Sequence, residues 1–245
     1  MHIAILMANT DESCFAQRHP KDGEKWPALL APFCPECRFS VYAVKDGEFP
    51  DQPLENYDGF IVTGSPASVL EGAEWQKQLA ATLRSVAEAK IPLFGACFGH
   101  QAIAQALGGK VEKNTDGWVF GVVETRSRNP APWMESGAIR QNAAHEEQVV
   151  CLPDGAETVL SNDTCKYGGF RVGNHVFTSQ YHPEITPAFM AALIDELAGV
   201  KPPEVIRAAR DSLDQEPENA RFAKWIVAFF RQGQLQENNA SGGDI

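Results

Sequence analysis

The stretch Ile-Pro-Leu-Phe-Gly-Ala-Cys-Phe-Gly-His-Gln, residues 91–101, decides the fold. It is a short apolar run that ends at Cys97 and leads directly into a segment rich in Ala, Leu and Gln. Such a run is typical of a buried strand, and residues 99–107, which stop at Gly108 and Gly109, are typical of a helix with its C-terminal glycine. The stretch therefore predicts a sharp strand-to-helix turn at Cys97.

Three more short apolar runs precede this stretch, at residues 3–8, 39–44 and 59–63. Between the third run and residues 91–96, residues 71–90 carry apolar side chains at helical spacing. Strands that alternate with helices form right-handed βαβ units and a parallel sheet with helices on both faces. We therefore predict an α/β domain with a mixed, largely parallel sheet.

Beyond residue 111 the pattern changes to short β-like runs that are separated by turn residues. These runs predict an antiparallel extension of the sheet. Residues 186–197 are again helical in pattern, with Phe189, Leu193 and Leu197 on one stripe. The β-like runs cover residues 119–125, 148–152, 158–161, 169–172 and 176–180.

Two further helices are predicted after Pro202 and Pro203, at residues 204–213 and 218–231. Their Trp and Phe content exceeds that of a solvated segment, so we expect them to pack on the preceding domain. The alternative is an exposed apolar stripe that marks a docking surface. We assign residues 1–200 to the main domain, 201–232 to a C-terminal helical extension packed on it, and the polar residues 233–245 to a disordered tail.

The charge of the chain limits its partners. Its 245 residues include 21 Lys and Arg against 32 Asp and Glu, a formal net charge of −11. This charge repels phosphate backbones and anionic lipids, so we expect no nucleic-acid and no membrane partner. The apolar start at residues 3–8 has no Lys or Arg before it and is too short for a secretory signal. We therefore expect a cytoplasmic protein whose six cysteines are reduced thiols.

Cys97 lies where a nucleophile elbow places its reactive side chain. Gly95 and Gly99, two residues to either side, let the backbone crowd such a turn without steric cost. A helix N-terminus favours the thiolate form of a cysteine, and the following backbone N–H can face a developing oxyanion. The alternative is an inert buried thiol beside a glycine-rich turn.

His182-Pro183-Glu184 can supply a base and the group that orients it. Residues two apart on an extended segment share a face, and Pro183 favours extension of the residue before it. His182 and Glu184 can therefore project the same way, one toward a thiol and the other behind the imidazole. Taken alone, the alternative is a strand end with an exposed histidine and a solvated glutamate.

These motifs together resemble the class I glutamine amidotransferase family of the triad type, as found in the glutaminase domain of GMP synthase and in stand-alone relatives. The resemblance rests on Gly95-x-Cys97-x-Gly99-x-Gln101 and on residues 180–184, Gln-Tyr-His-Pro-Glu. Residues 63–66, Thr-Gly-Ser-Pro, resemble that family's oxyanion loop, although many members have Gly where this chain has Ser65. The resemblance covers residues 3–197 and implies the family's flavodoxin-like architecture.

The resemblance implies a role for each matching position. Cys97 would attack the side-chain amide of glutamine, giving a γ-glutamyl thioester and ammonia, with His182 as the base and Glu184 as its orienter. No metal and no organic cofactor is needed for this reaction. Gly64 and Gln101 would contact bound glutamine, and the backbone N–H groups of Ser65 and Phe98 would form the oxyanion hole.

Four other residues are of types that occur in functional sites, but their surroundings in the sequence do not match a known site motif. We expect His100 to pack or cap in the first turn of its helix, away from the thiol. His145 either resembles a family position near the synthetase-facing side or is a loop histidine beside an acidic pair. Cys34 and Cys37 have the spacing of a zinc or redox pair, but no second pair follows, so we expect no metal or redox role.

The use of the ammonia stays open at this point. A separate synthetase chain could take it, because this sequence has neither a pyrophosphatase loop nor a Walker loop. Alternatively, the enzyme acts alone on a γ-glutamyl peptide or amide. A third possibility is a non-catalytic regulatory binding module, against which the complete set of three reactive groups argues. The sequence does not predict the oligomeric state.

Overall fold

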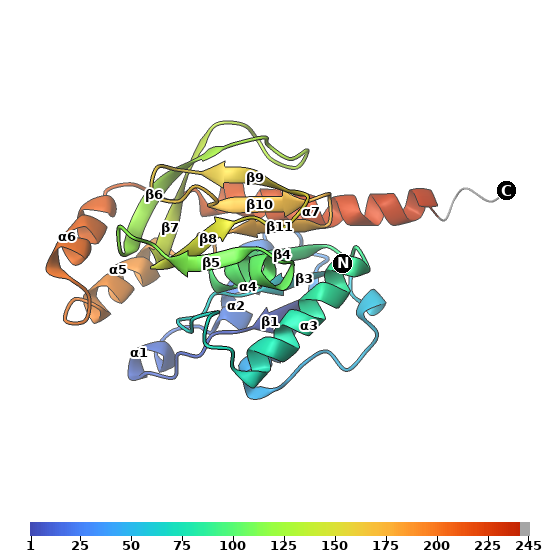
Figure 1. Ribbon diagram of the computed structural model, residues 1–245, viewed down its shortest axis with the longest axis horizontal. Coiled ribbons are helices and arrows are strands. Elements are labelled where there is room, and N and C mark those ends of the chain that lie inside the picture. Colours follow the sequence, from blue (N-terminus) through green and yellow to red (C-terminus); the bar gives the residue numbers. More distant parts are fainter. Residues whose placement is uncertain (241–245) are drawn as a thin grey trace.

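The computed structural model describes the backbone of residues 1–240 and the side chains of residues 1–233. Its centre is a nine-stranded sheet with the order β2-β1-β3-β4-β11-β10-β9-β6-β7 (Figure 1). The expected mixed sheet is confirmed. The parallel part comprises β1 (His2–Met7), β2 (Arg38–Ala43), β3 (Gly59–Val62), β4 (Leu93–Ala96) and β11 (Val176–Ser179). The antiparallel part comprises β6 (Val119–Ser127), β7 (Ala138–His145), β9 (Ala156–Ser161) and β10 (Gly169–Val172).

Two of the predicted β-like runs lie elsewhere than in the antiparallel extension. Strand β11 pairs in parallel with β4, so the run at residues 176–180 belongs to the parallel part. All four of its residues are buried, because β11 lies between β4 and β10 in the middle of the sheet. Strand β8 (Glu147–Cys151) pairs with β5 (Lys110–Lys113) in a separate two-stranded sheet.

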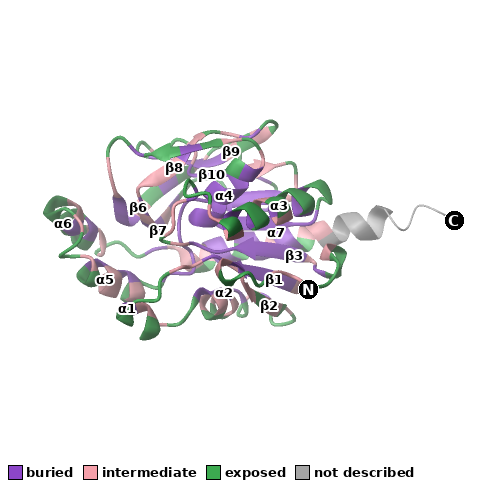
Figure 2. Cartoon of the chain, turned by 60° about the horizontal axis from the view of Figure 1, so that its bottom comes forward, coloured by how far each residue is buried: buried purple, intermediate pink, exposed green. Residues whose placement is uncertain are grey.

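Helices cover both faces of the main sheet. Helices α3 (Glu74–Glu88) and α4 (Phe98–Ala106) pack on one face, and α2 (Asp22–Leu30) and α7 (Asn219–Ala240) pack on the other. Successive side chains of β3 point to opposite faces of the sheet. Phe60 and Val62 lie on the face covered by α3 and α4, and Ile61 lies on the face covered by α2 and α7. Figure 2 shows the buried strands between them. The remaining helices are α1 (Cys14–Gln17), α5 (Pro187–Glu196), α6 (Pro203–Ser212) and the short 3-10 helices η1 (Val44–Asp46) and η2 (Leu54–Asn56).

Helix α7 supplies much of the core on its face of the sheet. Its aromatic side chains Phe222, Trp225, Phe229 and Phe230 are buried, and the Phe222 ring stacks on Phe177 of β11 with 5.8 Å between centroids. These side chains are therefore core residues and not an exposed stripe. The helix continues to Ala240, so it covers part of the stretch predicted as a tail. Residues 241–245 of that stretch lie outside the described residues.

The structure corrects the expectation of six reduced thiols. Cys34 and Cys37 form a disulfide, with 5.3 Å between their Cα atoms. The chain turns tightly after α2, because the Cys34 N–H donates to the Leu30 carbonyl and the Cys37 N–H to the Cys34 carbonyl. This turn brings the two thiols together. The free cysteines are Cys14, Cys97, Cys151 and Cys165. Of the helices that the structure describes, none has the length and apolar character needed to cross a membrane.

Candidate active site

The predicted site residues gather at one edge of the sheet. In parallel strands the carboxyl ends meet at the same edge, which is where ligands bind in open α/β sheets. Gly64 follows β3, Cys97 follows β4, and His182 and Glu184 follow β11. Parallel pairing of these three neighbouring strands therefore brings together segments that are far apart in the sequence.

Cys97 occupies a sharp turn between β4 and α4. Its φ of +49° is in a region that residues other than glycine rarely adopt. The close approach of α4 to β4 and to β3 explains both flanking glycines. A Cβ on Gly95 would lie 2.6 Å from the Gly99 carbonyl carbon, and a Cβ on Gly99 would collide with the Val62 carbonyl oxygen. The Cys97 side chain itself is buried, at 5% exposed, and its thiol is free.

The imidazole of His182 lies against the carboxylate of Glu184. The distance from His182 Nδ1 to Glu184 Oε1 is 2.7 Å, and both side chains are buried. The segment that carries them is not extended as predicted, because β11 ends at Ser179 and the chain then bends and turns. The turn itself places the two side chains together. Asn142 holds this turn, since its carbonyl accepts from the His182 N–H and its side chain donates to the Ile185 carbonyl.

The charge state of His182 depends on Cys97 and Glu184. Burial alone would lower the pKa of the imidazole. The negative charges of Cys97 and Glu184, together with the hydrogen bond to Glu184, outweigh burial and hold the pKa of His182 well above its usual range. The arrangement favours the imidazolium form of His182.

The oxyanion-loop residues lie directly beside this pair. A Cβ on Gly64 would be 2.8 Å from His182 Cε1 and 3.7 Å from Cys97 Cβ, so a glycine is needed for the imidazole to occupy its position. Within the part of the chain that the structure describes, the backbone N–H groups of Ser65 and Phe98 donate to no protein acceptor. These N–H groups are thus available to a ligand.

Gln101, which was expected to contact bound glutamine, does not line the cavity over Cys97. Its side-chain amide donates to the Glu147 carbonyl at 2.7 Å and to Gln180 Oε1 at 3.2 Å. Gln101 is buried. A contact between Gln101 and a substrate stays a prediction.

The two other histidines of interest are buried and neutral. His100 packs as expected, since its Nδ1 lies 2.8 Å from Thr178 Oγ1 and its ring contacts Phe170. His145 is the last residue of β7 and not a loop residue, with its Nδ1 3.1 Å from the Glu147 carbonyl oxygen. Burial lowers the pKa of His100 to about 3 and that of His145 to about 4.

A cavity of about 510 Å³ opens over Cys97, His182 and Glu184. It extends past Gly64 and Ser65 to a wall that the sequence analysis did not identify. This wall comes from the loop after β1, from α1 and the start of α2, and from α5. Its only signal in the sequence is the apolar stripe of α5. Among the described residues, no group of three or more His, Cys, Asp or Glu is arranged to hold a metal ion.

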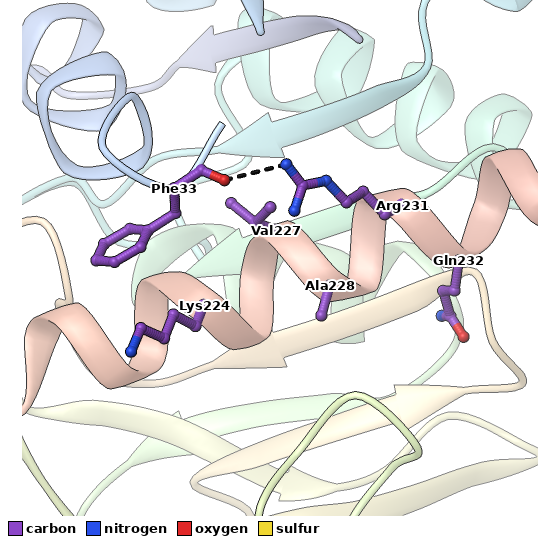
Figure 3. Close-up of a pocket in the computed structure, with 6 residues that line it drawn as sticks. All are labelled: Phe33, Lys224, Val227, Ala228, Arg231 and Gln232. Carbon is purple, nitrogen blue, oxygen red and sulfur yellow. Dashed lines mark hydrogen bonds between the residues drawn. The ribbon is translucent and has the colours of Figure 1, made fainter. Parts of the chain in front are cut away.

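A second hollow, of about 390 Å³, lies on the outer surface of α7. In Figure 3 Arg231 reaches from α7 to the carbonyl oxygen of Phe33, a hydrogen bond of 3.1 Å. None of the predicted site residues lines this hollow. Its lining residues are Phe33, Lys224, Val227, Ala228, Arg231 and Gln232.

Comparisons with known proteins agree with this geometry. Residues 36–195 match the model of the family described as glutamine amidotransferase class-I. The chain is 28% identical over 196 residues to gamma-glutamyl peptidase 3 of Arabidopsis thaliana, which covers 76% of this chain and 74% of that protein. It is 29% identical over 191 residues to a GMP synthase of Herminiimonas arsenicoxydans, which covers 69% of this chain and 34% of that protein.

Solved structures show the same fold at lower identity. The structure of a glutamine amidotransferase from Methylobacillus flagellatus superposes with a TM-score of 0.73 at 18% identity, covering 95% of this chain and 94% of that chain. A glutamine amidotransferase from Thermotoga maritima gives a TM-score of 0.71 at 18% identity, covering 94% and 96%.

Proposed function

Because the chain belongs to the class I glutamine amidotransferase family, we propose that it hydrolyses γ-glutamyl amide bonds with Cys97 as the nucleophile. The observation that carries this proposal is the His182 imidazole, which hydrogen-bonds to Glu184 and lines the same cavity as Cys97. A nucleophile, its base and the group that orients the base are the parts of a covalent acyl-transfer site. In this proposal Cys97, His182 and Glu184 have these three roles.

In the first half-reaction the Cys97 thiolate attacks the γ-carbonyl carbon and forms a C–S bond. The oxygen of the tetrahedral intermediate carries the negative charge and faces the N–H groups of Ser65 and Phe98. The His182 imidazolium then gives its proton to the leaving nitrogen as the C–N bond breaks. Ammonia or an amine leaves, and a γ-glutamyl thioester remains on Cys97.

In the second half-reaction water replaces the amine. The neutral imidazole of His182 takes a proton from water, and the oxygen attacks the thioester carbonyl. The C–S bond breaks and releases glutamate, which restores the thiolate and the imidazolium. Glu184 holds the imidazole in place throughout, as the acidic member does in other triads.

Two hypotheses for the substrate differ in whether a partner synthetase chain is required. A hydrolase that acts alone on a γ-glutamyl peptide or amide is supported by the peptidase relatives, of which the chain covers 74% and 82% in two cases. A glutaminase that supplies ammonia to a separate synthetase chain is supported by the GMP synthases, of which it covers only 34% and 29%. We favour the first hypothesis, because relatives of similar extent support it.

The test is hydrolysis by the purified chain without ATP or a partner. We expect glutamate release from glutamine or from a γ-glutamyl peptide such as γ-glutamylglycine. Cys97→Ala should abolish release, whereas Cys151→Ala, which changes an exposed free cysteine elsewhere, should not. Unchanged turnover by Cys97→Ala would overturn the covalent mechanism. Inactivity toward every γ-glutamyl compound, with activity gained only on addition of a synthetase, would overturn the stand-alone hypothesis. Inactivity under both conditions would favour a non-catalytic binding module.

A further inference from the structure

Helix α5 carries two neighbouring apolar stripes. Met190 and Ile194 are fully buried. Phe189, Leu193 and Leu197 pack against the same core cluster but are only partly buried, and they line the same cavity as Cys97 and His182. We call these three residues the α5 stripe. Apolar side chains that stay partly exposed on the wall of a cavity are typical of a ligand site.

Aromatic rings opposite α5 continue this apolar wall. Helix α1 lies beside α5 in Figures 1 and 2. The ring of Phe15 in α1 lies 5.5 Å from that of Phe189, and the ring of His19 lies 5.0 Å from it. The Lys25 ammonium lies 4.0 Å from the centre of the Phe189 ring. Contacts from two sides therefore hold the Phe189 ring in place, so the wall is formed before any ligand arrives.

The charged residues of the cavity largely neutralise one another. Lys25 Nζ lies 3.0 Å from Asp22 Oδ1. Lys45 Nζ lies 2.6 Å from Glu12 Oε1 and 2.8 Å from Asp46 Oδ1. Because Lys25 and Lys45 already pair with carboxylates, and the lining holds five carboxylates against three lysines, the cavity offers little attraction to a ligand with several negative charges.

The cavity is also larger than glutamine requires. Its volume of about 510 Å³ falls in the range of sites for drug-sized ligands. If glutamine were the substrate, the leaving group would be ammonia, which has no apolar surface to cover the α5 stripe. We propose that the α5 stripe binds the leaving amine, so that the preferred substrate is a γ-glutamyl peptide or amide whose amine carries an aliphatic or aromatic side chain. This inference rests on the proposed function.

The experiment compares leaving groups that differ in apolar surface. The purified full chain is given γ-glutamylleucine, γ-glutamylphenylalanine, γ-glutamylglycine or glutamine, and glutamate release gives kcat/KM for each. The amines of leucine and glycine are alike in basicity, so the chemical step is matched. Since each methylene that enters a hydrophobic pocket is worth about tenfold or more, we expect the leucine compound to exceed the glycine compound by roughly 10- to 100-fold.

Variants of α5 test whether the stripe causes this preference. Leu193→Ser should lower the ratio of kcat/KM for γ-glutamylleucine over γ-glutamylglycine by about tenfold, and Leu193→Met, which keeps the apolar volume, should restore most of it. Ala188→Ser, on an exposed position of the same helix, is the matched control and should keep the wild-type ratio. The ratio does not depend on how much of a variant folds, because both substrates are measured with one preparation.

The outcomes separate the inference from the function on which it rests. Equal kcat/KM for the leucine and glycine compounds, or a ratio that Leu193→Ser leaves unchanged, would overturn the inference while the hydrolase proposal stands. No hydrolysis of any of the four compounds would overturn both.

Discussion

His182 Nδ1 lies 2.7 Å from Glu184 Oε1, and the same imidazole lines one cavity with Cys97. The two residues are separated by Pro183 alone, in a turn that Asn142 holds by two hydrogen bonds. This relationship fixes the direction of the ring and favours its protonated form. Whether the site carries out acyl transfer therefore depends on this pair as much as on the nucleophile.

Glu184→Gln should weaken catalysis without abolishing it. A neutral amide preserves part of the orientation of the ring but not the charge, so we expect kcat/KM to fall roughly 10²-fold. Loss of the charge should also lower the pKa of His182, because Glu184 is one of the two groups that raise it. NMR titration of the His182 ring in both proteins measures this shift. An unchanged pKa would show that the carboxylate does not act on the ring.

His182→Ala and His100→Ala should differ sharply. His182→Ala should reduce kcat/KM by about 10⁴-fold or more, because loss of one member of a catalytic unit removes most of the rate enhancement that the whole unit provides. His100→Ala removes a buried side chain that contacts Thr178, so it should lower the melting temperature and retain far more activity. Steady-state kinetics with a folded-fraction correction from circular dichroism makes the comparison. The reverse order would show that the two histidines have each other's roles.

Gly64→Ala should damage the site through geometry alone. The added methyl would lie 2.8 Å from His182 Cε1, so the imidazole must move. A displacement of about 1 Å can cost roughly 10²-fold, which is the loss in kcat that we expect. Gly199→Ala is the matched control, because its Cβ would meet nothing within 4 Å and its φ needs no glycine. Equal activity of the two variants would contradict the close packing of β3 on the imidazole.

His145 should make the protein sensitive to acid. Burial lowers the pKa of His145 to about 4, whereas an unfolded histidine titrates near 6.5. The unfolded chain therefore binds more protons between these values, so the stabilising contribution is present above about pH 6.5 and is lost as the pH falls through about 4. Urea unfolding between pH 7 and 4 should show a flatter loss of unfolding free energy in His145→Gln than in the wild type. Identical slopes would mean that His145 is not a buried neutral group.

The parallel core was predictable because its strands are apolar on both faces. Residues 59–63 and 91–96 are short apolar runs, and the helix between them has a clear stripe. Strand β7 was missed because two of its buried residues, Gln141 and Asn142, are polar and make side-chain hydrogen bonds that hydropathy does not reveal. Helix α2 was missed because it contains Pro27, a residue that disfavours helix interiors.

The reactive groups were predictable from motifs, but the cavity around them was not. Cys97 and His182 lie next to glycines or prolines at short fixed spacings, which a sequence displays directly. The wall formed by α1 and α5 exists only because helices about 170 residues apart in the chain pack together, a tertiary contact without a local pattern. The stripe of Phe189, Leu193 and Leu197 was visible, but its exposure to a cavity was not.

The most direct test of the central claim is to trap the γ-glutamyl thioester. The purified protein is mixed with a γ-glutamyl substrate and quenched in acid, and its peptides are mapped by mass spectrometry. We expect the added mass of one γ-glutamyl group on the peptide that contains Cys97, and its absence in Cys97→Ala. Turnover with no adduct, or with the adduct on Cys14 or Cys151, would contradict it.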